Sequence, residues 1–202
     1  MKKIKNIVFD FGGVLLDWNP RYFYRGHFSD KNEMEHFLAH VCTDEWNAEQ
    51  DRGRPFAEGV KKLQKEHPKY HDEIQLFTDK WESMLKSEIH HGVNLLKKLK
   101  EKGYKIYGLT NWSAETIPTA FRKYDFFKLF DGIVVSGEEK FIKPDKRIYQ
   151  ILLERYNLNA EESLFLDDSP ANVKSANELG FEGILFDNIE NVEKQLTELS
   201  VL

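Results

Sequence analysis

The sequence predicts an α/β protein with a doubly wound parallel sheet and a small helical domain inserted into it. Short runs rich in β-branched and aromatic residues recur along the chain, and amphipathic helical patterns separate them. This alternation is typical of a parallel sheet covered by helices. Only residues 17–88 interrupt it, with a helical pattern and no strand-and-turn rhythm. So long a connection favours a small inserted domain over a structureless loop.

Five short runs are predicted as strands of a Rossmann-like sheet. The strands are expected at residues 4–9, 105–109, 132–135, 163–166 and 183–186. Helices are expected between them at residues 93–102, 114–124, 146–156 and 171–179. The last helix has clear boundaries, since Ser169 is placed to cap it, Pro170 suits its first turn and Gly180 can end it in the left-handed conformation.

The segment between the first two strands is predicted to form a separate helical domain. Its apolar residues recur at three- and four-residue spacing, as amphipathic helices require. They include Phe56, Val60 and Leu63, and later Ile74, Phe77, Trp81 and Leu85. We therefore expect an α/β core formed by residues 1–16 and 89–202 and a helical domain formed by residues 17–88.

The composition is that of a globular protein and argues against several classes of partner. The 202 residues are 41% hydrophobic and 31% charged, which lies outside the range of disordered chains. A formal net charge of −5 argues against a general nucleic-acid or membrane surface. No apolar run approaches the roughly 20 residues that span a bilayer. The single cysteine, Cys42, suits a reducing compartment, so we expect a cytoplasmic protein.

Polar residues follow four of the predicted strands, where ligands bind in a doubly wound sheet. The segments are Asp10-Phe11-Gly12-Gly13, Thr110-Asn111, Ser136-Gly137 with Lys143-Pro144-Asp145 beyond, and Asp167-Asp168-Ser169. Carboxylates, a lysine, small hydroxyls and glycines that expose backbone N–H groups suit phosphate and a hard divalent cation. The sequence therefore predicts a site for both at this edge of the sheet.

Four segments, taken in order, resemble the motifs of the haloacid dehalogenase (HAD) superfamily. They read FDFGGVL, LTNWS, KPD and LFLDDSPANVKSANELG. The resemblance covers the whole chain. Among subgroups, the pattern is similar to the helical-cap subgroup that includes small sugar-phosphate phosphatases and the phosphatase domain of epoxide hydrolases. It implies an HAD-like core with a helical cap. It also implies a Mg²⁺-dependent phosphoric monoester hydrolase that acts on a small phosphorylated metabolite.

The resemblance implies a role for each residue that matches a motif. Asp10 matches the nucleophile, which attacks phosphorus and forms an aspartyl-phosphate. Lys143 matches the cation that pairs with the nucleophile and with the phosphoryl oxygens. Thr110 matches a hydroxyl that binds the phosphoryl group, and the Asn111 backbone N–H would add a second donor.

The resemblance also implies the residues that hold Mg²⁺. Asp168 matches the metal-binding acid, and it would share the ion with Asp10 and the Gly12 carbonyl. Asp167 matches a neighbour that orients Lys143 or metal-bound water. Adjacent carboxylates repel unless a cation or hydrogen bonds offset the repulsion, so this pair favours a metal site over a solvated loop.

Position 12 departs from the phosphatase pattern. A second Asp, two residues after the nucleophile, usually acts there as general acid and base, but this chain has Gly12. Such catalysis contributes about 10²- to 10⁴-fold to the rate. Three explanations stay open: a cap side chain substitutes, the substrate has a good leaving group, or the enzyme is slow. The cap side chains to test are His27, Glu49, Asp51 and Arg52.

Four further residues are candidates for substrate selection. Asp17 and Trp18 lie at the entrance of the cap, Arg52 lies within it, and Trp112 directly follows the phosphate-binding turn. A surface or packing role explains each of them as well.

Two other functions remain open at this point. Dehalogenases of the family use the residue that matches Asp10 to attack carbon, need no metal and lack the second Asp, as this chain does. A protein of the same fold that binds phosphate with little turnover is the other alternative. The acidic pair Asp167 and Asp168 favours phosphoryl transfer, because dehalogenation has no use for it.

Overall fold

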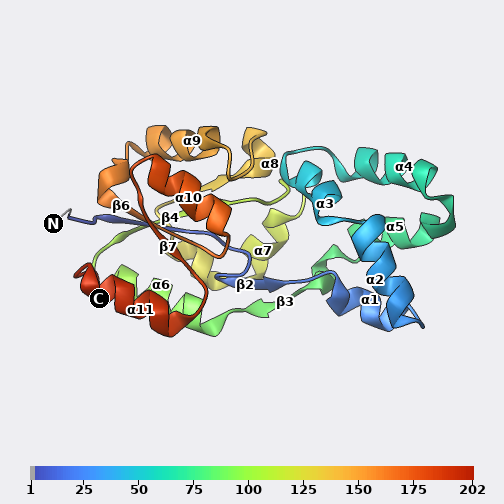
Figure 1. Cartoon of the computed structure of the whole chain (residues 1–202), viewed down its shortest axis with the longest axis horizontal. Helices are drawn as coiled ribbons and strands as arrows, with labels where there is room; N and C mark the ends of the chain where they lie inside the picture. The colour runs from blue at the N-terminus through green and yellow to red at the C-terminus, as the bar shows by residue number, and fades with distance from the viewer. Residues whose placement is uncertain (1–2) are drawn as a thin grey trace.

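The computed structural model describes residues 3–202, and a five-stranded parallel sheet forms its centre (Figure 1). The strands are β1 (Asn6–Phe9), β4 (Lys105–Thr110), β5 (Gly132–Val135), β6 (Ser163–Asp167) and β7 (Glu182–Leu185). Their order is β5-β4-β1-β6-β7, and every neighbouring pair is parallel. The α/β prediction is therefore confirmed. The strand order reverses at β1, and sheets of this kind bind ligands beyond the carboxyl ends at that point.

Helices cover both faces of this sheet (Figure 1). One face carries α6 (His90–Glu101), α7 (Ile117–Lys123) and α11 (Ile189–Glu198), and the other carries α9 (Lys146–Tyr156) and α10 (Pro170–Glu178). Successive strand side chains point to opposite faces. Ile7 and Phe9 accordingly join the apolar cluster that contains α6 and α11, whereas Val8 joins the cluster of α9 and α10. Within the described residues, no helix is both long and apolar enough to cross a membrane.

Five helices lie together at one end of the molecule, between β2 (Leu16–Trp18) and β3 (Leu85–Glu88) (Figure 1). They are α1 (Arg21–His27), α2 (Lys31–His40), α3 (Asp44–Asp51), α4 (Phe56–Glu66) and α5 (His71–Asp79), with the 3₁₀ helices η1 (Pro68–Tyr70) and η2 (Trp81–Met84). We call this set the inserted helices. The antiparallel pair β2 and β3 connects them to the sheet. The sequence did not predict these two strands, since three or four residues are too few for a recognisable alternation.

Other boundaries shift by a few residues from the predicted ones. Helix α6 begins at His90 rather than at 93, and α7 is shorter than predicted. The short elements α8 (Ser136–Glu139), η3 (Asp125–Leu129) and η4 (Ala160–Glu162), and the longer α11, were not predicted. Ser169 stands at the N-cap position of α10, but its side chain accepts no cap hydrogen bond. Its backbone N–H instead donates to Asp167 Oδ1 at 2.8 Å, so the carboxylate holds this turn.

Candidate active site

The carboxyl ends of β1, β4 and β6 bring four buried polar residues together. Asp10 directly follows β1, Thr110 ends β4 and Asp167 ends β6, while Lys143 reaches them from the loop between α8 and α9. The Asp10 N–H donates to the Leu166 carbonyl at 2.9 Å, which joins the ends of β1 and β6. Charged groups in such a place need partners, because burial without them is costly.

Lys143 pairs with two carboxylates at once. Its Nζ lies 2.8 Å from Asp10 Oδ1 and 2.7 Å from Asp167 Oδ2, and it donates a hydrogen bond to the Leu109 carbonyl at 2.8 Å. Burial lowers the pKa of Lys143, but Asp10 and Asp167 outweigh it and raise that pKa above its ordinary value. The ammonium is therefore charged at neutral pH, and it links the two acids.

Asp167 is held entirely by protein groups. Its Oδ1 accepts hydrogen bonds from the Ser169 N–H at 2.8 Å and from Asn172 Nδ2 at 2.9 Å. Its Oδ2 accepts from Lys143 and, at 3.1 Å, from Asn172 again. Both oxygens are thus occupied, and the carboxylate orients Lys143. The sequence analysis missed Asn172, although its place five residues after Asp167, in the first turn of α10, was a usable signal.

Asp10 keeps one oxygen free. Its Oδ1 accepts a hydrogen bond from the Phe11 N–H at 2.7 Å and faces Lys143, whereas no described residue donates to Oδ2. Burial raises the pKa of Asp10 to about 7, with Lys143 opposing the rise and Asp167 adding to it. A bound cation would lower that pKa, because it favours the ionised form. The free oxygen is the atom suited to attack a substrate.

Asp10, Asp167 and Asp168 form a cluster that could hold a metal ion. One oxygen from each lies within 4.8 Å of the other two. Since Asp167 is fully hydrogen-bonded, Asp10 and Asp168 are the carboxylates available to a cation. Burial and the neighbouring Asp167 raise the pKa of Asp168. Bringing acids this close is costly without a cation, so the donor set fits one.

Gly13 allows Asp168 to approach the end of β1, a role that the sequence analysis missed. Its φ is +71°, and a Cβ at this position would lie 2.0 Å from Asp168 Oδ2. Any side chain here would be strained and would push the carboxylate away. The double glycine of FDFGGVL was the available signal, but only the backbone angle shows which glycine is needed.

The last residue of β4 presents a free hydroxyl, and the residue after it supports Lys143. Thr110 Oγ1 is buried and has no hydrogen-bond partner among the described residues. The Asn111 side chain accepts from the Lys143 N–H at 2.8 Å and donates to the Lys143 carbonyl at 3.0 Å. Asn111 therefore fixes the backbone of Lys143, while the Thr110 hydroxyl is available to a ligand.

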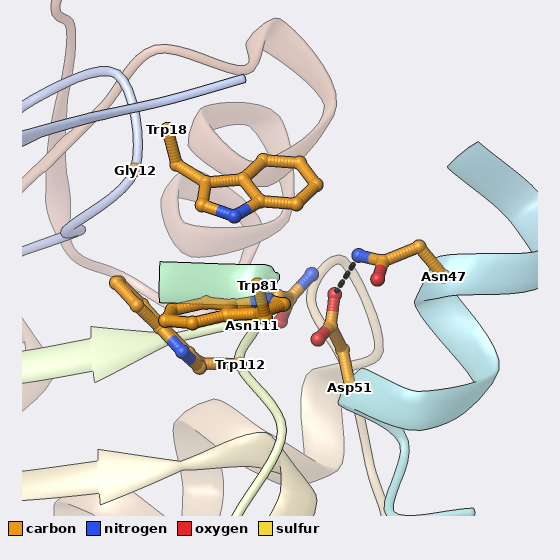
Figure 2. A pocket seen from close by; sticks show the side chains of 7 residues that line it. All are labelled: Gly12, Trp18, Asn47, Asp51, Trp81, Asn111 and Trp112. Carbon is orange, nitrogen blue, oxygen red and sulfur yellow. Dashed lines mark hydrogen bonds between the residues drawn. The ribbon is translucent and has the colours of Figure 1, made fainter. Parts of the chain in front are cut away.

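A cavity of about 130 Å³ adjoins these residues (Figure 2). It is lined by Gly12, Trp18, Asn47, Asp51, Trp81, Asn111 and Trp112. The Trp81 ring centroid lies 6.4 Å from that of Trp18 and 5.6 Å from that of Trp112, which gives one wall a large aromatic surface. Asn47 and Asp51 face it from α3, joined by a hydrogen bond of 3.1 Å. Trp18 Nε1 and Asn47 Oδ1 are buried without a partner among the described residues.

The structure thus brings two of the four predicted selection residues to this cavity. Trp18 and Trp112 line it, whereas Asp17 and Arg52 do not. Asp17 accepts hydrogen bonds from the Tyr22 hydroxyl at 2.7 and 2.8 Å. Arg52 is half exposed at the end of α3 and pairs with Glu49 at 3.5 Å. Asn47 and Trp81 line the cavity and were missed, because nothing in the sequence indicates which face of their elements turns to the core.

Comparison with known proteins supports these observations. Residues 4–180 match the family of haloacid dehalogenase-like hydrolases. A sesquiterpene phosphatase of Aspergillus oryzae is 28% identical over 181 residues, which cover 89% of this chain and 88% of that protein. Drimenol cyclase of Aspergillus calidoustus is 33% identical over 104 residues, which are 52% of this chain but only 20% of the cyclase.

Solved structures give the same result. A HAD family enzyme from Bacteroides thetaiotaomicron, in complex with magnesium and inorganic phosphate, is 26% identical with a TM-score of 0.67. The similarity covers 90% of this chain and 93% of that one. With the family match over most of its length, the sheet order and the clustered acids at the strand ends, this chain belongs to the haloacid dehalogenase-like hydrolases.

Proposed function

We propose that this hydrolase is a Mg²⁺-dependent phosphatase that acts on a small phosphorylated metabolite through an aspartyl-phosphate on Asp10. The observation that carries the proposal is the arrangement around Lys143, whose ammonium joins Asp10 and Asp167 beside a carboxylate oxygen that is free to react. The Aspergillus phosphatase and the Bacteroides complex with magnesium and phosphate support it.

The side chains of the site have complementary tasks in this reaction. Asp10 Oδ2 attacks phosphorus, and the bond from phosphorus to the leaving oxygen breaks. The Lys143 ammonium attracts the phosphoryl oxygens and offsets their charge, and the unpartnered Thr110 hydroxyl donates to one of them. Asp167 keeps Lys143 in place throughout.

Asp10 and Asp168 would hold Mg²⁺ together with the Gly12 carbonyl. This set offers oxygen ligands with two carboxylates, as Mg²⁺ prefers. When bound, the ion would offset negative charge that develops on the transferring phosphoryl group. Gly13 serves this site by leaving room for the Asp168 carboxylate.

We assign residues 17–88 to a cap that covers the site, and residues 3–16 and 89–202 to the core, while residues 1 and 2 of the predicted core lie outside the described residues. The assignment rests on the cavity, because Trp18, Asn47, Asp51 and Trp81 line it from the segment between β1 and β4. A cavity of about 130 Å³ suits a small leaving group. The cap would then exclude water from the phosphoryl group and contact the rest of the substrate.

A substrate screen with and without metal tests this proposal. Phosphorylated metabolites and 2-haloacids are incubated with the protein in Mg²⁺ or in EDTA, and phosphate and halide are measured. We expect phosphate release that requires Mg²⁺ and that Asp10→Asn protein, purified in parallel, does not show. Halide release that EDTA leaves unchanged would overturn the proposal in favour of a dehalogenase. Ligand binding without release of either product would overturn it in favour of a binding protein.

A further inference from the structure

The proposed reaction needs a proton donor for the leaving oxygen, and position 12 does not supply one. Gly12 lies in the cavity wall, and a Cβ built there would meet no atom within 4 Å. The space beside the nucleophile is thus open on this side. An alkoxide is a poor leaving group unless an acid protonates it, so the donor must come from elsewhere or be absent.

Of the four cap side chains considered for this role, the structure leaves one. His27 Nε2 lies 3.6 Å from Glu73, and its ring stacks on Phe23 with centroids 5.9 Å apart. Glu49 and Arg52 pair with each other while each is more than two-fifths exposed. Only Asp51 lines the cavity, on the side opposite Trp18 and Gly12 (Figure 2).

The surroundings of Asp51 suit a group that gives and takes a proton. Its Oδ2 accepts a hydrogen bond from Asn47 Nδ2 at 3.1 Å, and no lysine or arginine of the described chain forms an ion pair with it. Burial raises the pKa of Asp51 to about 7, and a hydrogen bond from the Ser113 backbone opposes the rise. Both protonation states are therefore available near neutral pH, as general acid–base catalysis requires.

The core fixes the position of Asp51 through its backbone. Ser136 Oγ donates to the Asp51 carbonyl at 2.5 Å and accepts from the Trp112 N–H at 2.9 Å. Two residues further along the chain, Lys140 Nζ donates to the Gly53 carbonyl at 3.2 Å. These contacts tie the end of α3 to α8 and, through Ser136, to Trp112 in the loop that follows β4. The backbone of Asp51 is thus fixed beside the cavity, which pre-positions its carboxyl group for a substrate.

We propose that Asp51 is the general acid and base of this enzyme and fills the role that Gly12 leaves open. The proposal rests on the proposed function. In the first step Asp10 Oδ2 bonds to phosphorus, the bond to the leaving oxygen breaks, and the Asp51 carboxyl gives that oxygen its proton. In the second step water attacks phosphorus, the Asp51 carboxylate accepts a proton from it, and the bond from Asp10 to phosphorus breaks. Phosphate leaves and both residues return to their first state.

Leaving-group dependence gives the sharpest test. Rates of the wild-type protein and of Asp51→Asn are measured on alkyl and aryl phosphates whose leaving groups span a wide range of pKa. We expect Asp51→Asn to lower kcat/KM by about 10²- to 10⁴-fold on alkyl phosphates, which need the proton. The activated aryl esters should react at nearly the wild-type rate, so the dependence becomes steeper. Glu49→Gln, on the same helix but outside the cavity, is the matched control and should change neither.

A second substitution tests the same role from the other side of the cavity. Because position 12 has room for a side chain, Gly12→Asp combined with Asp51→Asn should recover part of the lost rate on alkyl phosphates and flatten the dependence. A merely structural role of Asp51 would give no such recovery.

Two results would overturn the proposed role of Asp51, and a third would overturn the proposed function itself. An equal loss on all esters in Asp51→Asn would mean that the residue positions substrate and transfers no proton. If that variant does not fold, the wild-type protein still decides, since a steep dependence in it would mean that no acid assists the leaving group. If even activated aryl esters release no phosphate through Asp10, the proposed function itself fails.

Discussion

Two regions line the candidate site, and they differ in how far their polar side chains are paired. At the end of the sheet, both oxygens of Asp167 are occupied by hydrogen bonds from Lys143, Asn172 and the following turn. In the part of the wall that residues 17–88 form, Trp18 Nε1 and Asn47 Oδ1 are buried with no partner among the described residues.

The difference indicates that the two regions bind different parts of the substrate. An unpaired buried polar group costs about 1–3 kcal/mol, so such groups are expected where a ligand supplies the partner. The core presents a pre-organised arrangement of charges to the phosphoryl group, which all phosphate esters share. Trp18 Nε1 and Asn47 Oδ1 instead offer unpaired hydrogen-bonding atoms to the rest of the substrate, which differs from one ester to another. Substitutions in the core should therefore lower kcat, metal affinity or stability, and substitutions of Trp18 or Asn47 should raise KM.

The largest effect is expected for Asp10→Asn in the core. The amide is nearly isosteric but is not a nucleophile, so kcat should fall by at least about 10³-fold while the protein still folds. Steady-state rates on the best substrate and a thermal unfolding curve check both parts. A rate within about tenfold of wild type would remove Asp10 from this role.

Lys143→Ala should destabilise the fold as well as the reaction. Removing the ammonium leaves Asp10 and Asp167 buried and unpaired, which costs about 3–5 kcal/mol of the free energy of unfolding. The folded-state pKa of Asp10, already raised by burial, then lies further above its unfolded value, so the variant loses more stability as pH rises from about 4 to 8.

Urea unfolding in EDTA measures this loss. Lys146→Ala is the matched control, since Lys146 pairs with Glu178 at the surface, and it should leave the unfolding midpoint nearly unchanged. Equal midpoints for both variants would contradict the buried ion-pair account.

Gly13→Ala should act on the metal through Asp168. Strain at positive φ costs about 1–3 kcal/mol, and the new methyl group must displace the carboxylate. Gly103 has a φ of +91° but nothing within 4 Å of a built Cβ, so Gly103→Ala carries strain of the same kind without the clash. We expect both variants to lose stability and only Gly13→Ala to need more Mg²⁺ for half-maximal rate. Equal Mg²⁺ requirements would mean that Gly13 has only a backbone role.

The smallest effect is expected for Trp18→Phe in the cavity wall. The change removes the indole N–H and keeps most of the aromatic surface beside Trp81. Losing one hydrogen bond to the substrate should raise KM by about 2- to 10-fold with little change in kcat. A fall in kcat at unchanged KM would contradict the division between the two regions.

The core side of the site follows from the sequence far better than the cavity wall does. Asp10 and Asp167 stand at or next to the ends of buried strands, so strand prediction alone directs them to one edge of the sheet. Asn47 and Trp81 depend instead on how α3 and η2 pack on the core, and helical periodicity reports an apolar face without naming its partner.

Asp17 and Trp18 illustrate the same limit within one dipeptide. Both were predicted to select the substrate, but they are neighbours in β2, and the register of β2 with β3 shifts between them. Trp18 lines the cavity, whereas Asp17 accepts a hydrogen bond from the Tyr22 hydroxyl. Because neither this short strand nor the irregularity in it can be recognised in the sequence, the different surroundings of the two side chains could not be predicted.

The stereochemical course at phosphorus tests the central claim most directly. A phosphorothioate ester made chiral at phosphorus with two oxygen isotopes is hydrolysed in Mg²⁺ and in water of the third isotope, and the configuration of the released thiophosphate is determined. Attack by Asp10 followed by attack of water comprises two in-line displacements, each with inversion, so the account predicts net retention. Net inversion would mean that water attacks the substrate directly, and it would contradict an aspartyl-phosphate on Asp10.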